Sequence, residues 1–276
     1  METELHDHDR GLAFDLSTLL ERRRVLGLFG AAGLVTLAGC STDSAAPGAT
    51  QGATQTGSAT TPAATAGGSC EKIPSETAGP FPGDGSNGPN ILTQSGIVRS
   101  DIRSSIGTGS ATAKGVPLTI NLTIQNTGNG CAAYAGAAVY IWHCDMNGLY
   151  SMYSPGVTNE NYLRGVQEAN SSGALTFQSV FPGAYSGRWP HIHFEVYPTL
   201  SAATAAGNKA ATSQLALPEA VCNAVYATSG YSSSISNMSR TTLQNDGVFR
   251  DGVTKQMATV TGDATSGYVA SLVVPV

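Results

Sequence analysis

The richest concentration of chemically active side chains lies in residues 181–196, with the sequence FPGAYSGRWPHIHFEV. His191 and His193 alternate there with Ile192 and Phe194, an order that favours a β-strand. Because alternate side chains of a strand share a face, both imidazoles are predicted to project the same way. Neutral imidazole is a common metal ligand in proteins, so the pair predicts a metal site. The competing interpretation is a half-buried strand that carries two polar histidines.

Alternating apolar and polar residues predict the strands that would position this pair. Residues 117–125 alternate Leu and Ile with Thr and Asn, which is typical of a half-buried strand. In residues 137–144 the same alternation places Val139 and Ile141 on one face and Trp142 on the other. The other segments with strand character are 174–180, 188–196, 255–261 and 267–274, and residues 218–227 form the one expected helix. Short strands joined by Gly-rich turns predict an all-β fold, a sandwich of mostly antiparallel strands with long loops.

The first 39 residues have the features of an export signal. Arg22 and Arg23 resemble the pair of a twin-arginine signal, and the uncharged residues 25–39 that follow are too few to span a bilayer. This stretch ends in LAG before Cys40, which resembles a bacterial lipoprotein box with Cys40 as the lipidated residue. A short buried helix is the alternative. We expect a protein lipid-anchored to the outer face of the cytoplasmic membrane or to the cell envelope. The twin-arginine pathway exports proteins folded inside the cell, so a metal can be loaded before export.

Residues 40–69 are expected to be the lipidated cysteine and a flexible tether. All but three of residues 41–69 are Ala, Gly, Ser, Thr or Pro, which cannot build a core. The catalytic domain is therefore predicted to span residues 70–276, a size typical of one domain. Without residues 1–39, which hold four Lys/Arg and six Asp/Glu, the formal net charge changes from −5 to −3. With no basic patch, nucleic acid is not expected as a partner.

Four cysteines remain when Cys40 is assigned to the lipid. An even number in an exported protein predicts two disulfides, for which three pairings are possible. No Cys-x-x-Cys pair occurs, so a structural zinc site is not expected. Among the pairings we favour Cys70–Cys131 with Cys144–Cys222, which leaves the metal site free of sulfur.

Several motifs in this order resemble the intradiol ring-cleavage dioxygenases, the catechol and protocatechuate dioxygenase family. The match covers about fifty central positions and, with one motif on each side, most of residues 70–276. The motifs are ETAGPF at 76–81, WHCDMNGLY at 142–150, LRG at 163–165, PGAY at 182–185, RWPHIHF at 188–194 and TSQL at 212–215. The chain departs from the family's intracellular members in having a tether where they carry a helical segment.

The resemblance implies a single non-haem Fe(III) ion per chain. Its ligands would be Tyr150, Tyr185, His191 and His193, with Tyr185 and His193 axial. Two tyrosinates and a hydroxide would balance the ferric charge, which lowers the cost of burying it. His143 is expected to support or pack near this site and not to be a fifth ligand.

The resemblance also implies the groups around the substrate. Arg188 would stabilise negative charge that develops on the ring, since a guanidinium is permanently cationic. Gln214 matches the family's active-site glutamine, and Gly79 and Pro80 would line the pocket. Tyr185 would leave the metal and take a proton from the substrate. Arg164 is expected to be structural.

The function implied is cleavage of catechol-type rings between the two hydroxyl-bearing carbons, with O2, to muconate-type diacids. The iron would activate the organic substrate, which agrees with the absence of an NAD or flavin motif. The alternative is a metal-bearing β-sandwich binding module without turnover. A hydrolase is disfavoured because neither Gly-x-Ser-x-Gly nor His-Glu-x-x-His occurs.

Overall fold

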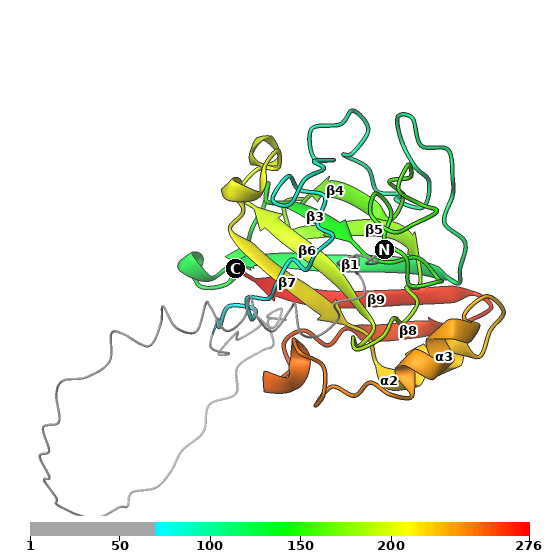
Figure 1. Cartoon of the computed structure of the whole chain (residues 1–276). Helices are drawn as coiled ribbons and strands as arrows, with labels where there is room; N and C mark the ends of the chain where they lie inside the picture. Colours follow the sequence, from blue (N-terminus) through cyan, green and yellow to red (C-terminus); the bar gives the residue numbers. More distant parts are fainter. Residues whose placement is uncertain (1–69) are drawn as a thin grey trace, which may run out of the picture.

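Two β-sheets packed face to face form the domain in the computed structural model, which describes residues 70–276 (Figure 1). One sheet has the strand order β4-β3-β6-β7 and is antiparallel throughout. The other has the order β2-β1-β9-β8, with β5 also paired to β1, and only the β1–β9 pair is parallel. The prediction of an all-β sandwich is confirmed.

The strands are β1 (Pro117–Asn126), β2 (Ala132–Ala133), β3 (Ala138–Trp142), β4 (Arg164–Glu168), β5 (Ala174–Val180), β6 (His191–Tyr197), β7 (Ala211–Ala216), β8 (Thr259–Asp263) and β9 (Gly267–Pro275). Within residues 70–276 the α-helices are α2 (Glu219–Tyr226) and α3 (Ser232–Met238), which lie beside each other at one edge of the sandwich in Figure 1. Short 3₁₀ turns occur at Thr127–Asn129, Leu200–Ala202, Ala206–Asn208 and Phe249–Asp251.

The main core lies between the sheets and follows the predicted alternation. On β1 the inward Leu and Ile side chains are at most 1% exposed, while the Thr and Asn side chains between them reach the surface. On β3, Val139 and Ile141 join this core, whereas Tyr140 and Trp142 belong to a second cluster on the opposite face. The β4-β3-β6-β7 sheet is thus buried on both faces, and chain segments before β1 cover its outer face through residues such as Ile91. The outer face therefore also carries buried side chains, such as Trp142.

Strand β6 begins three residues later than predicted. Pro190 has no N–H to donate to a neighbouring strand, and the Trp189 N–H donates to the Asp246 side chain instead. Similarly, β8 starts at Thr259 and not at residue 255, because the N–H groups of Gln256 and Met257 donate to the Val253 carbonyl in a turn. The expected helix is confirmed as α2, and α3 is a second helix that was not predicted.

One of the two favoured disulfides is present. Cys70 and Cys131 are bonded, with their Cα atoms 5.6 Å apart. The pairing of Cys144 with Cys222 is wrong, since both thiols are free and buried. They belong to different clusters: Cys222 on α2 lies in the core between the sheets, and Cys144 lies outside it and donates to the Gly183 carbonyl. Burial raises the pKa of both thiols, which disfavours the reactive thiolate.

The predictions for the export signal, the lipidated Cys40 and the tether concern residues 1–69 and lie outside the described residues. In residues 70–276, no helix is both long and apolar enough to cross a bilayer.

Candidate metal centre and active site

Four side chains from three segments meet on the outer face of the β4-β3-β6-β7 sheet. The Nε2 atoms of His191 and His193 lie 3.0 Å apart. The Tyr185 hydroxyl is 3.1 Å from His191 Nε2 and 3.3 Å from the Tyr150 hydroxyl, which is itself 3.5 Å from His191 Nε2. Two phenol oxygens and two imidazole nitrogens, those of the four residues that the resemblance proposes as ligands, therefore lie around one small volume.

Local structure fixes each of these positions. His191 and His193 lie on β6, and their shared face follows from the strand's two-residue repeat. Tyr150 follows a turn in which one oxygen of the Asp145 carboxylate accepts the N–H groups of residues 147 and 149. The loop that carries Tyr185 packs against this turn at Gly183, where a Cβ atom would lie 2.6 Å from the Met146 carbonyl oxygen. Only glycine permits this approach, which brings the two tyrosine loops together.

His191 presents a bare nitrogen to the centre, and both histidines are buried. His191 Nδ1 bonds to the Trp189 carbonyl, which can only accept, so the proton is on Nδ1 and Nε2 carries a lone pair. His193 stacks on Trp142 at 4.8 Å between ring centroids with an interplanar angle of 6°. Burial, and then the positive charge of Arg188, lower the pKa of His191 to about 3, and burial lowers that of His193. Both imidazoles are therefore neutral and suited to bind a cation.

The Tyr150 phenol alone would stay neutral. Burial raises the pKa of Tyr150 well above its ordinary value, with the neighbouring Tyr185 as the second cause. A bound cation reverses this balance, because it stabilises the phenolate directly. No group of three or more His, Cys, Asp or Glu side chains in residues 70–276 is arranged to hold a metal. The candidate centre therefore depends on its two tyrosines for negative charge.

Gly79 and Pro80 lie on the segment that covers this face. Gly79 has φ +68°, and a Cβ atom there would lie 3.4 Å from Cε1 of His193. Its N–H donates to the Thr77 hydroxyl, and the Pro80 carbonyl accepts from the Asn87 amide. Because residue 79 is a glycine, no side chain at this position covers the edge of the His193 ring.

No protein-family model and no curated protein matches the sequence. Among solved structures, an intradiol ring-cleavage dioxygenase from Tetranychus urticae matches with 28% identity and a TM-score of 0.57, over 74% of this chain and 94% of that one. A second dioxygenase structure matches with 27% identity and a TM-score of 0.58, over 74% of this chain and 93% of that one. The chain is a structural relative of the intradiol ring-cleavage dioxygenases. The predictions of fold and of an enzyme of the intradiol dioxygenase type, an oxidoreductase, are confirmed.

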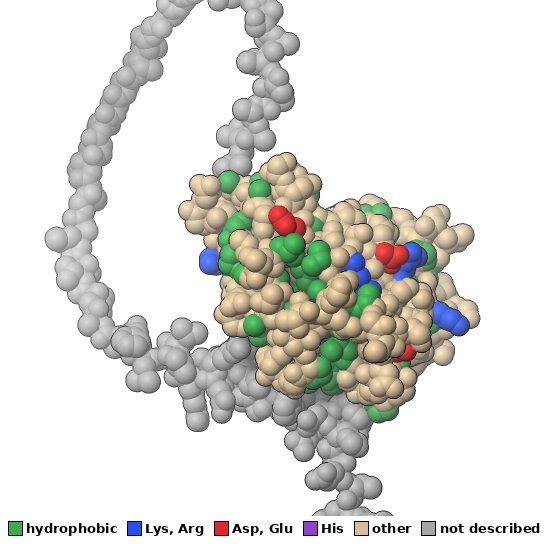
Figure 2. Space-filling model, turned by 90° about the horizontal axis from the view of Figure 1, so that it is seen from above, with side chains coloured by type: hydrophobic (Ala, Val, Ile, Leu, Met, Phe, Trp, Pro, Cys, Tyr) green, Lys and Arg blue, Asp and Glu red, His purple; other side chains and the backbone are tan. Residues whose placement is uncertain are grey.

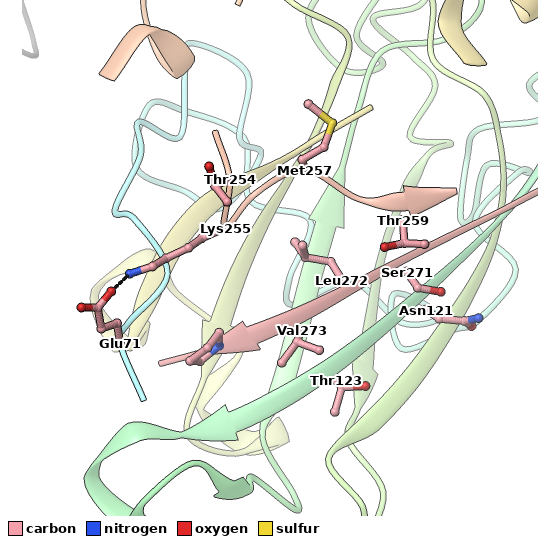
Figure 3. Close-up of a pocket in the computed structure, with 11 residues that line it drawn as sticks. Glu71, Asn121, Thr123, Thr254, Lys255, Met257, Thr259, Ser271, Leu272 and Val273 are labelled. Carbon is pink, nitrogen blue, oxygen red and sulfur yellow. Dashed lines mark hydrogen bonds and ion pairs between the residues drawn. The ribbon is translucent and has the colours of Figure 1, made fainter. Parts of the chain in front are cut away.

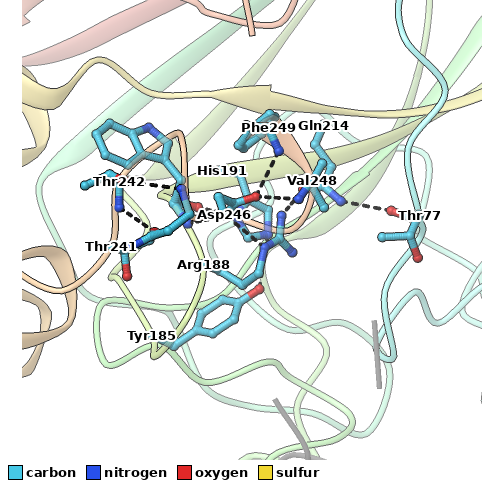
Figure 4. A network of polar contacts seen from close by, with 12 residues as sticks. Thr77, Tyr185, Arg188, His191, Gln214, Thr241, Thr242, Asp246, Val248 and Phe249 are labelled. Carbon is cyan, nitrogen blue, oxygen red and sulfur yellow. Dashed lines mark hydrogen bonds and ion pairs between the residues drawn. The ribbon is translucent and has the colours of Figure 1, made fainter. Parts of the chain in front are cut away.

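In this intradiol-type domain, Arg188 and Gln214 lie together beside the centre (Figure 4). An N–H of the Arg188 guanidinium donates to Gln214 Oε1 at 2.6 Å, and the Gln214 amide donates to the Thr77 carbonyl at 2.9 Å. Gln214 is the cross-strand partner of His193 in the β6–β7 register, which brings it to the centre despite the sequence separation. Arg188 also pairs with Asp246, 3.0 Å away, a residue that sequence analysis did not single out.

His143 and Arg164 are structural in this domain. His143 lies on the inner side of its sheet, where Nε2 contacts the Ser179 hydroxyl of β5 at 2.7 Å and so links the two sheets. Arg164 is 1% exposed, and its donors go to the Phe81, Pro82 and Ser151 carbonyls and to hydroxyls. It holds the segment before β1 against β4, as expected of a structural arginine.

One pocket on the surface of residues 70–276 lies apart from the candidate centre. Figure 2 shows a face on which charged side chains are scattered and uncharged ones dominate. A pocket of about 520 Å³ lies on the outer face of the other sheet, lined by Asn121, Ser271 and Val273 beside the Lys255–Glu71 ion pair (Figure 3). None of the four converging side chains lines it, and it holds no histidine or tyrosine.

Glu76 is expected to make stability depend on pH. Burial raises the pKa of Glu76 from 4.5 to about 7, although the hydrogen bond from Gln256 lowers it. Among the charges that face this carboxyl group, Asp251 and Asp246 raise the pKa and Arg188 lowers it. The folded state therefore keeps a proton that the unfolded state loses above about pH 4.3. This contribution to stability is complete below that pH and declines as pH rises through 7. We expect the melting temperature to fall between pH 5 and 8, and to fall less in Glu76→Gln.

The matched control is Glu168→Gln, which removes an exposed glutamate. It should keep the wild-type slope of melting temperature against pH. An unchanged slope in Glu76→Gln would mean that Glu76 is not the group responsible.

Proposed function

We propose that this protein is a non-haem Fe(III) intradiol dioxygenase that cleaves catechols with O2 between the two hydroxyl-bearing carbons, giving muconate-type diacids. The observation that carries the proposal is the convergence on His191 Nε2, which lies within 3.5 Å of the Tyr150 and Tyr185 hydroxyl oxygens and of His193 Nε2. The structural likeness to a dioxygenase named as an intradiol ring-cleavage enzyme supports it.

The donor set fits a ferric ion. Tyr150, Tyr185, His191 and His193 would hold it, with two phenolates and a hydroxide cancelling the charge of +3 so that the unit can be buried. Neutral imidazoles complete the set because their protonated forms are disfavoured at this site. When bound, the ion would withdraw electron density from a coordinated catecholate and make its ring reactive toward O2.

The two tyrosines are not equivalent in the structure. Tyr150 is 2% exposed, whereas Tyr185 is half-buried, so part of its side chain reaches solvent. Tyr185 is therefore the phenolate suited to accept a proton at its oxygen from an entering catechol hydroxyl. Tyr150 remains as the permanent anionic ligand. Arg188, fixed beside the centre, would stabilise the negative charge that develops on the substrate.

The substrate is proposed to be a catechol with neutral substituents. A carboxylated catechol such as protocatechuate needs a cation to bind its carboxylate, but Arg188 already pairs with Asp246 and Arg164 is buried among carbonyls. We expect kcat/KM for catechol and methylcatechols to exceed that for protocatechuate by at least about 10-fold, the cost of burying an unpaired charge being larger than 1.4 kcal/mol. A panel of these substrates with hydroxyquinol measures it, and a preference for protocatechuate would contradict the proposed class.

The test of the function is colour followed by oxygen uptake. Purified protein should contain one iron per chain, absorb visible light through tyrosinate-to-Fe(III) charge transfer, and consume O2 when catechol is added. A protein that binds iron and catechol without consuming O2 would instead be a binding module. A colourless protein that carries zinc after growth with ample iron would contradict the assignment of the metal.

We further propose that the protein acts outside the cytoplasmic membrane, anchored by a lipid on Cys40. The support is the twin-arginine pattern at residues 22–23 followed by the lipoprotein-like LAGC sequence. Cys40→Ser should shift most of the protein from the membrane fraction to the soluble fraction, because a lipid anchor contributes about 0.8 kcal/mol per buried CH₂. Fractionation with immunoblotting measures this, Ser41→Ala serves as the control, and unchanged membrane association of Cys40→Ser would overturn the proposed anchor.

A further inference from the structure

Asp246 has a fully buried carboxylate that accepts four N–H donors. It lies in the segment between α3 and β8, far along the chain from the predicted site residues. The donors are Arg188 Nε at 3.0 Å and the backbone N–H groups of Trp189 at 2.6 Å, Val248 at 2.7 Å and Phe249 at 3.0 Å. Figure 4 shows this carboxylate at the middle of the polar network beside the centre.

The two oxygens of this carboxylate serve different partners. Oδ1 accepts the N–H groups of Val248 and Phe249 and so caps the turn that follows Asp246 itself. Oδ2 accepts from Arg188 and from the Trp189 N–H. The turn needs only one acceptor oxygen, so the second oxygen is available to orient the residues before β6.

The Arg188 guanidinium is held from two directions. Asp246 accepts from Nε, and Gln214 accepts from a terminal nitrogen at 2.6 Å. A long arginine side chain has about 2 kcal/mol of rotamer entropy, which these bonds remove before any substrate arrives. Burial favours the neutral acid, but the positive charge of Arg188 and the N–H donors hold the pKa of Asp246 below its ordinary value. The pair is therefore ionic near neutral pH.

The same carboxylate reaches a candidate metal ligand through one residue. The Trp189 N–H donates to Asp246, and the Trp189 carbonyl accepts the proton on Nδ1 of His191. That hydrogen bond keeps Nε2 of His191 directed at the centre. Fixing the Trp189 main chain thus fixes the imidazole as well as the guanidinium.

We propose that Asp246 is a positioning residue of the reaction, orienting Arg188 directly and His191 through Trp189. The expected effect on kcat rests on the proposed function. The expected effect on the position of Arg188 does not depend on it. Partners in this outer layer of a metal site typically contribute about 10- to 100-fold to activity. The dependence on Arg188 distinguishes a positioning role from a merely structural one.

The test compares Asp246→Asn and Asp246→Ser with wild type. Both substitutions keep an oxygen that can cap the turn, and both remove the anionic acceptor for Arg188. We expect kcat to fall roughly 10- to 100-fold with KM changed less than about 3-fold. In an Arg188→Gln background, Asp246→Asn should cost less than about 3-fold more, because Arg188, which it orients directly, is already gone and only its effect through Trp189 on His191 remains. The control is Asp84→Asn, which removes the charge of a different buried carboxylate, one that pairs with Lys209. This variant should keep wild-type kcat.

Crystal structures of the Asp246 variants supply a second readout that does not need turnover. The Arg188 guanidinium should move by more than about 1 Å, a displacement large enough to matter for catalysis. Unmoved Arg188, unchanged kcat, or full additivity with Arg188→Gln would overturn the proposal. If wild type itself fails to cleave catechols, the proposed function is wrong, and the position of Arg188 in the variants still decides whether Asp246 orients it.

Discussion

Tyr150→Phe is expected to lose iron and colour and, with them, nearly all dioxygenase activity. The phenol is 2% exposed, so its phenolate would balance the metal charge in a place that water cannot reach. Removing one member of a buried charge group costs about 3–5 kcal/mol, which lowers metal affinity roughly 10²- to 4 × 10³-fold. Iron per chain, measured after dialysis against a mild chelator, should fall to a small fraction of the wild-type value.

The matched control is Tyr153→Phe. Tyr153 lies three positions further along the same loop, but its hydroxyl accepts the Gly83 N–H and donates to Asn87, away from the centre. Its removal should cost about 1 kcal/mol of stability, the value of a typical hydrogen bond, and leave iron and colour intact. Equal iron loss in both variants would show that the loop, and not the Tyr150 phenolate, is what matters.

Tyr185→Phe is expected to keep much of its iron and yet lose most of its activity, in contrast to Tyr150→Phe. Tyr150, His191 and His193 remain to hold the metal, so a substantial share of the iron should stay bound. The variant lacks the base that would accept a catechol proton, and a positioned base contributes about 10²- to 10⁴-fold. We expect kcat to fall by that factor, and the visible absorption band to weaken and shift because one of two tyrosinates is gone.

Single-turnover mixing of catechol with the iron-loaded variant separates the two effects. Slow formation of the substrate complex, normalised to bound iron, would support the role of Tyr185 as the base. Normal kinetics per iron would mean that another group takes the proton, and a complete loss of iron would mean that Tyr185 is as essential for metal binding as Tyr150.

The parts of the fold that sequence could predict are those with regular hydrophobic alternation. The β1 and β5 segments were predicted to within a residue because one face of each is buried and the other meets water. The strand β7, with the sequence ATSQLA, has no such alternation because it is buried on both faces. The helix α3 could not be predicted either, since its sequence SSSISNM carries no amphipathic stripe.

The residues of the candidate centre were predictable because they form motifs. The residue that orients them, Asp246, was not predictable. Asp246 lies in the sequence Asn-Asp-Gly, which by itself indicates only a turn. Its partner Arg188 is 58 positions away, a contact that depends on how the segment after α3 folds back over the sheet. The pairing of Cys144 with Cys222 failed for a similar reason. An even number of cysteines predicts disulfides, but the packing of the fold leaves these two thiols free, and this packing cannot be read from the sequence.

The most direct test of the central claim is product identification from catechol under ¹⁸O2. Purified, iron-loaded protein should consume one O2 per catechol and release a muconate-type diacid that carries label from the gas, resolved by mass spectrometry. The Tyr150→Phe protein run in parallel should give none of it. A yellow semialdehyde product, which reports cleavage outside the two hydroxyl-bearing carbons, or the absence of O2 consumption by the iron-loaded protein, would contradict the proposed function.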